Sequence, residues 1–206
     1  MNWLETKRSA QHSHYAGHSG HRWMMIAFLA ALVGVFVTHS ALQGDRRLVL
    51  AGFRAREAVL ARLLVVTAAT LLAVAVSAAI MATVFTPASW PPVIAALLLT
   101  GLIYAAIGAL VGVLLDKLAA TYLILFVIMT DLGVVQSPMF HARPVKFAWL
   151  LPGFPLDRLL YAGAFSHSFN AIGELLLALG WLTALAVVVY LVLRRALGTR
   201  SGTNRS

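Results

Sequence analysis

The chain has 206 residues, of which 61% are hydrophobic and only 11% are charged. Soluble domains carry roughly a quarter charged residues, so this composition excludes a soluble domain and indicates a polytopic membrane protein. The absence of cysteine excludes disulfides, a thiolate nucleophile and cysteine-based metal sites. The net charge of +9 would favour nucleic acid as the partner of a soluble chain. Beside apolar segments the basic residues are more simply explained as topology signals, and we expect no nucleic-acid partner.

Five apolar segments are each long enough to cross a hydrocarbon core, which takes about 20 helical residues. They cover residues 23–42, 63–85, 93–115, 118–136 and 175–193. The sequence therefore predicts an all-α membrane helix bundle of about five spans, within a domain at 23–195. Residues 1–22 are expected to form a disordered polar tail, and residues 196–206 a basic tail. The first segment is interpreted as a retained anchor rather than a signal peptide, because its apolar stretch is long.

The distribution of basic residues predicts the orientation. Ten Lys and Arg residues follow the first span, the third span and the last span, and six lie in the opposite segments. Because basic residues are retained in the cytoplasm, we expect the N-terminus outside and the C-terminus in the cytoplasm.

The basic segment at 43–62 predicts an amphipathic helix on the cytoplasmic surface, with its apolar residues broadly on one side. Its charged candidates for a contact are Arg46, Arg47, Arg54, Arg56 and Glu57. Two interpretations stay open. The segment is either a topology marker resting on anionic membrane lipid or a docking element for a cytoplasmic partner.

The segment at 138–173 is predicted on the outer side of the membrane but is too apolar to extend into water. Its prolines exclude one long helix. We expect it to fold back against the spans as a re-entrant loop, with a turn at 151–155 and a short helix at 157–165 that begins at Asp157.

Small residues recur along the third span. Gly101, Ala105, Gly108 and Gly112 have helical spacing that places them on one face, where another backbone can approach closely. This pattern favours a packing seam, either within the chain or between subunits.

Asp131 is the one acid well inside a predicted span, where a carboxylate is costly. It is either a proton or substrate site or a structural pin bonded to Gln136, Ser137 or a neighbouring loop. The pin is favoured, because the sequence shows no second buried acid or base to form a relay with it.

The sequence lacks the usual chemistry of an enzyme. It has no phosphate-binding G-x-x-x-x-G-K-[ST] loop and no H-E-x-x-H motif. Four histidines in the N-terminal tail could in principle bind a metal, but no helix fixes their geometry. We expect no catalytic residue, no metal site and no cofactor bound by this chain.

The order of the parts resembles the permease subunit of a type II ABC exporter of the kind found in high-GC actinobacteria. The resemblance rests on REAVLARL (56–63), LIYAAIGALVGVLL (102–115), TDLGVVQSPMF (130–140) and LPGFPLDRLLYAGAF (151–165). It implies a bacterial plasma-membrane location and an efflux substrate such as a lipid, glycoconjugate or hydrophobic drug. The family has six spans per half, so this chain is expected to lack the first.

The resemblance also implies partners. These are a second permease half, identical or not, and cytoplasmic P-loop ATPase subunits that bind ATP and Mg²⁺. Residues 45–60 would couple to the ATPase, and the external segment would form a lid over the exit path. The lid residues are Pro152, Gly153, Pro155 and Arg158. The alternatives are an ion-coupled secondary transporter or channel that uses Asp131, and a membrane assembly or scaffold subunit.

Overall fold

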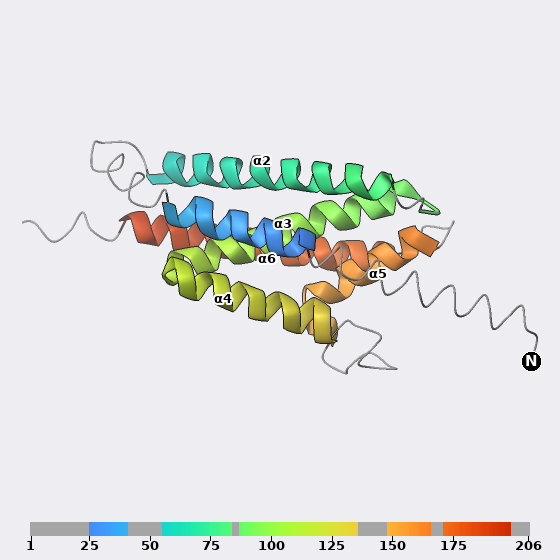
Figure 1. Cartoon of the computed structure of the whole chain (residues 1–206). Coiled ribbons are helices and arrows are strands. Elements are labelled where there is room, and N and C mark those ends of the chain that lie inside the picture. Colours follow the sequence, from blue (N-terminus) through green and yellow to red (C-terminus); the bar gives the residue numbers. More distant parts are fainter. Residues whose placement is uncertain (1–24, 41–54, 84–86, 136–147, 166–170, 199–206) are drawn as a thin grey trace, which may run out of the picture.

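The computed structural model describes residues 25–40, 55–83, 87–135, 148–165 and 171–198, and within these ranges the chain is all-helical, without a strand (Figure 1). The elements are a first helix at Met25–Ser40, then α2 (Ala55–Ala82), α3 (Trp90–Leu114), α4 (Lys117–Ile128), the π-helix η1 (Met129–Val135), the 3-10 turn η2 (Ala148–Leu150), α5 (Gly153–Phe165) and α6 (Ile172–Gly198).

Within the described ranges, four helical stretches are long and apolar enough to cross a membrane, as expected of a multi-pass membrane protein. They are Arg56–Ala82, Trp90–Leu114, Lys117–Val135 and Ile172–Ala196. The third stretch consists of α4 and η1, which follow each other without a break. The first predicted span corresponds to the shorter helix Met25–Ser40.

Two predicted boundaries differ from the structure. Residues 55–62, predicted as part of a separate surface helix, instead continue without a break into the second span as α2. No glycine or proline separates these basic first turns from the apolar body, and Ala, Leu, Glu and Arg all favour helix. The short outer helix begins at Gly153 rather than at Asp157. Pro155 does not prevent this earlier start, since the first turn of a helix tolerates a residue without a backbone N–H.

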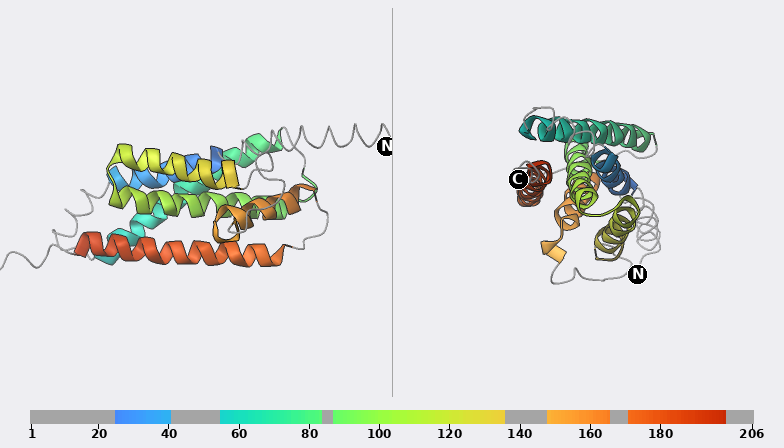
Figure 2. Two further views of the ribbon diagram at one scale, coloured as in Figure 1. Left: turned by 90° about the horizontal axis from the view of Figure 1, so that it is seen from below. Right: turned by 90° about the vertical axis from the view of Figure 1, so that its left-hand side faces the viewer.

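Helix α3 forms the centre of the bundle. Of the 18 most apolar consecutive residues of α3, 61% are buried. The same share is 17% for α2, 22% for α4 with η1 and 11% for α6. Viewed along the helices in Figure 2, α2, α6, α4 and the first helix surround α3. The outer helices therefore keep apolar sides on the surface, where lipid can replace a protein core.

Helix α5 is a half-length helix that lies beside the first half of α3 and also contacts α6. Its 13 residues extend for about 20 Å. The link before α3 is hydrogen-bonded to the last turn of α5, since Ala88 N donates to Ala164 O over 3.2 Å and Ser89 N donates to Gly163 O over 3.0 Å. The C-terminus of α5 thus lies at the end of the bundle where α2 ends and α3 begins. Its N-terminus lies toward the middle of the bundle, at Asp131.

Candidate functional site

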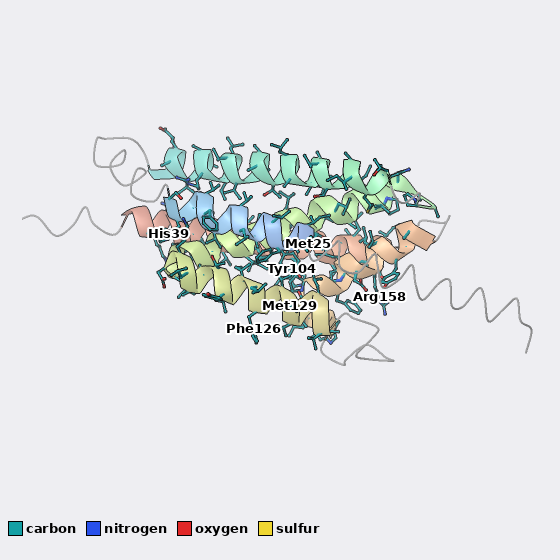
Figure 3. The ribbon with its side chains drawn as sticks, viewed as in Figure 1. Met25, His39, Tyr104, Phe126, Met129 and Arg158 are labelled. Atoms are coloured by element: carbon teal, nitrogen blue, oxygen red, sulfur yellow. The ribbon has the colours of Figure 1, made fainter. Side chains whose placement is uncertain are left out.

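The candidate site is a buried polar contact among α3, η1 and α5. Asp131 in η1 is 2% exposed. Its Oδ2 accepts a hydrogen bond from the Tyr104 hydroxyl over 2.7 Å and another from the backbone N–H of Gly153 over 3.1 Å. Tyr104 is fully buried and lies near the middle of α3, inside the bundle in Figure 3. The contact therefore joins three elements that are distant in sequence.

The carboxylate of Asp131 also caps α5. The first N–H groups of a helix have no intrahelical acceptor, and leaving one buried without a partner is costly. Asp131 accepts from Gly153 N, Leu151 O accepts from Phe154 N over 3.2 Å, and Pro155 has no N–H. A carboxylate at this end also interacts favourably with the helix dipole. Asp131 thereby stabilises the inward end of α5.

This approach requires glycine at position 153. A Cβ built on Gly153 would lie 2.5 Å from Asp131 Oδ1, 2.9 Å from Asp131 Cγ and 2.9 Å from Leu132 Cδ2. Any side chain there would push α5 away from η1. Gly153 and Asp131 were predicted as separate features, one in the lid and one in a span, and the structure brings them together.

Tyr104 is the member of this site that the sequence analysis missed. The available signal was that Tyr104 is the one ionisable side chain in the otherwise apolar α3. Its hydroxyl needs a partner when buried, and Asp131 is that partner.

The π-helical geometry of η1 also bears on the site. A π-helix is usually a short insertion in an α-helix and is frequent at functional positions. Here it covers Met129–Val135 and contains Asp131.

A second acid, Asp157, lies close to Asp131, so the expectation that no other buried acid accompanies Asp131 is wrong. Asp157 is half-buried and follows Gly153 by one helical turn, so both residues share the face of α5 that meets η1. Burial raises the pKa of Asp157 to about 7, the neighbouring Arg158 opposes this change, and the charge of Asp131 adds to it. Burial also raises the pKa of Tyr161, one turn further along α5, and the charge of Asp157 acts in the same direction.

Arg158 lies on the outer side of this region. Its Nη1 is 3.8 Å from Glu174 Oε1 in α6, with the two side chains 52% and 27% exposed. Its guanidinium also lies over the Phe154 ring, 4.7 Å from the ring centroid. At this exposure the ion pair contributes little to stability, so Arg158 acts mainly as a positive charge beside Asp157.

The predicted small residues of α3 face two different helices. A Cβ on Gly108 would collide with the backbone carbonyl of Ala31 in the first helix, and a Cβ on Gly112 would lie 2.9 Å from Val35 O. From the other side, a Cβ on Gly34 would collide with Ala105 O. These contacts form a close seam between α3 and the first helix.

Gly101 instead faces α2. A Cβ on Gly101 would lie 2.6 Å from Val74 Cγ2 and 3.0 Å from Thr70 Cγ2. The small residues of α3 therefore allow neighbours to approach on two sides.

The predicted coupling residues lie partly within the described chain. Arg56 and Glu57 are exposed on the first turn of α2. Arg46, Arg47 and Arg54 lie outside the described residues. So do Gln136, Ser137 and the N-terminal histidines.

Arg62, one to two turns further along α2, is only 9% exposed. Its Nη1 donates to Val37 O over 2.7 Å, near the end of the first helix. A cation at a helix C-terminus is favourable, so Arg62 joins α2 to the first helix at this end of the bundle.

Comparison of the chain with known protein families, curated proteins and solved structures finds no match. Among the residues that the structure describes, no group of three or more His, Asp or Glu side chains could hold a metal ion.

Proposed function

We propose that the chain is the membrane-spanning permease subunit of an ATP-driven exporter in a bacterial plasma membrane. Its N-terminus lies outside and its C-terminus in the cytoplasm. A separate P-loop ATPase hydrolyses ATP, and a second permease half completes the pathway. The substrate class is a lipid, a glycoconjugate or a hydrophobic drug.

The observation that carries this proposal is the short helix α5, anchored with its N-terminus at Asp131. At about 20 Å it cannot cross a hydrocarbon core of about 30 Å. Backbone that enters a bilayer without crossing it is tolerated where protein buries it. The contacts of α5 with α3 and α6 supply that burial, which supports a re-entrant segment over an exit path.

The charges at the two ends of the bundle support the proposed orientation. The starts of α2 and α4 and the end of α6 lie at the same end in Figure 1. Basic residues at this end are Arg56, Arg62, Lys117, Arg194 and Arg195. At the other end, the described basic residue is Arg158. The positive-inside rule then favours the first end as cytoplasmic, with the helix Met25–Ser40 as the first of five spans.

The continuity of α2 supports coupling to an ATPase. Its 28 residues extend for about 42 Å as a single helix, and Arg56 and Glu57 are exposed on its first turn. A cytoplasmic protein that moves this turn would therefore move the whole helix. The first helix, bonded to α2 through Arg62, would be expected to follow.

The hydrogen bonds of Asp131 bear on the alternative of a secondary transporter. Oδ2 of Asp131 accepts hydrogen bonds from Tyr104 and from the start of α5, both within the chain. This arrangement favours a structural pin over a carrier site. An Asp131→Asn variant distinguishes the two, because a proton-coupled carrier would lose the pH dependence of transport and an exporter would keep its dependence on ATP.

The first test is affinity purification of the tagged chain in mild detergent, followed by mass spectrometry of the retained proteins. We expect a stoichiometric protein with a P-loop ATPase motif. Recovery of the chain alone from an intact preparation would contradict the exporter and leave a stand-alone carrier or a scaffold.

The coupling role is tested with a matched pair of variants. Arg54→Glu with Arg56→Glu should reduce ATP-dependent transport and retention of the ATPase without changing membrane insertion. Arg54→Lys with Arg56→Lys keeps both charges and should behave nearly as the unmodified chain. Normal transport by the charge-reversed variant would refute the docking role.

A further inference from the structure

We propose that Asp157 makes the docking of α5 proton-sensitive. With a proton on Asp157, the first turns of α5 stay docked against η1 and α3. Ionised Asp157 loosens that contact, because a charge is costly at this buried position and, to a smaller extent, because it repels the Asp131 carboxylate. This inference goes beyond the proposed function, because it concerns the position of α5 and requires neither an ATPase nor a substrate.

The geometry places Asp157 one helical turn from the contact between α5 and Asp131. Gly153 N bonds to Asp131 Oδ2 over 3.1 Å, and a Cβ at Gly153 would be 2.5 Å from Asp131 Oδ1, so η1 and α5 are in direct contact there. Residues four apart in a helix have Cβ atoms about 5–6 Å apart on one face. Asp157 therefore lies one turn after the contact point on the same side of α5, near enough for the charge of Asp131 to act on it.

Among the residues that the structure describes, few other charged or titratable groups lie around Asp157. On α3 the one ionisable side chain is Tyr104, which is bonded to Asp131. On α6 the one near this end is Glu174, paired with Arg158. The turn η2 contributes none. On α5 itself Arg158 and Tyr161 flank Asp157, and Arg158 is the single positive charge among these groups.

The direction of the pH effect follows from the two states of α5. Docking raises the pKa of Asp157 from its ordinary value of 3.8 to about 7, with burial as the largest cause. When α5 is undocked, water and distance from Asp131 return the pKa toward the ordinary value. Docking is then strongest below both values, weakens as the pH rises between them, and reaches a constant weaker level above about 7. One proton changes the docking equilibrium by at most about tenfold per pH unit in that window.

The test uses the natural absence of cysteine from the chain, which allows one thiol to be placed at a chosen position. Leu156 on α5 is 1% exposed, so Leu156→Cys reports undocking through its reaction with a water-soluble maleimide. Gly173→Cys serves as the reference, because nothing lies within 4 Å of the Cβ position there. The labelling rate at position 156 is divided by the rate at position 173, and this labelling ratio removes the pH dependence of the thiol reaction itself.

For the full-length chain in detergent, we expect this ratio to rise by up to about tenfold per pH unit from pH 5 toward pH 7 and then to level off. With Asp157→Asn added, the ratio should stay low at every pH. With Asp157→Glu, the dependence on pH should return. A flat ratio in the parent background, or the same rise in the Asp157→Asn background, would overturn the proposal.

A second measurement covers the case in which Leu156→Cys itself opens the site. Hydrogen exchange of α5 peptides is then followed in the cysteine-free chain, with α2 peptides as the reference for intrinsic pH effects. Exchange in α5 should increase over the same pH window, and Asp157→Asn should abolish the increase. If exchange in α5 changes with pH to the same extent with and without Asp157→Asn, the proposal is overturned.

Discussion

The backbone N–H of Gly153 donates a hydrogen bond to Oδ2 of Asp131 over 3.1 Å, so a spanning helix supplies the cap of the half-length helix that follows it. Tyr104 bonds to the same oxygen from α3. One carboxylate thereby fixes the inward end of α5 relative to the most buried helix of the bundle. Movement of α5 away from this position must break at least one of these bonds.

The first prediction concerns Gly153→Ala. The added Cβ would overlap Asp131 Oδ1, so we expect a loss of about 1–3 kcal/mol from the free energy of unfolding. Gly173→Ala is the matched control, because its Cβ meets nothing within 4 Å. Unfolding by SDS titration in mixed micelles measures both. Equal stability of the two variants would show that α5 does not dock on Asp131.

The second prediction concerns the bond between Tyr104 and Asp131. Tyr104→Phe removes one donor from a buried carboxylate, and we expect it to cost about 1–3 kcal/mol. Asp131→Ala removes the acceptor of this bond altogether, so its cost should overlap with that of Tyr104→Phe.

A double-mutant cycle of these two substitutions measures the overlap, again by SDS titration. The coupling energy should be about 0.5–3 kcal/mol, as for residues in direct contact. Strictly additive effects would contradict the direct bond.

Much of the fold follows from hydropathy alone, because a helix of about 20 apolar residues is the simplest way to satisfy backbone groups in lipid. The polar contact that fixes α5 could not be derived in this way. Asp131 was recognised as costly, but its partner Tyr104 lies in a mostly apolar helix where a single tyrosine can also pack as an apolar residue, and Gly153 contributes only a backbone N–H. Such a contact depends on the placement of three elements, which local sequence patterns do not encode.

The start of α5 shows the same limit on a smaller scale. Asp157 resembles an N-terminal helix residue, and the two prolines before it resemble a turn. The helix begins earlier because Asp131, from a different element, accepts the hydrogen bond of Gly153 and takes the place of a local cap. Asp157 is thereby moved into the second turn, one helical turn after the N–H that Asp131 caps.

The third prediction concerns Arg158, whose positive charge opposes the effect of burial on the pKa of Asp157. Arg158→Gln should raise this pKa above about 7, so the labelling ratio should level off at a higher pH than in the parent chain. Glu174→Gln breaks the contact between Arg158 and Glu174 but leaves the charge of Arg158. It should change the pH midpoint less than Arg158→Gln does. A downward movement of the midpoint in Arg158→Gln would contradict the role of its charge.

The last prediction concerns the seam between α3 and the first helix. Gly108→Ala places a methyl group against the backbone carbonyl of Ala31, and a backbone atom cannot move aside as a flexible side chain can. We expect a loss of about 1–3 kcal/mol from the free energy of unfolding and a weaker contact between the two helices. Gly180→Ala in α6 introduces the same methyl group where nothing lies within 4 Å, so it should leave stability unchanged or slightly raised. SDS titration compares the two variants, and crosslinking of cysteine pairs placed on α3 and the first helix measures the seam itself. A Gly108→Ala variant as stable as Gly180→Ala, with undiminished crosslinking, would show that the two backbones do not meet at this glycine.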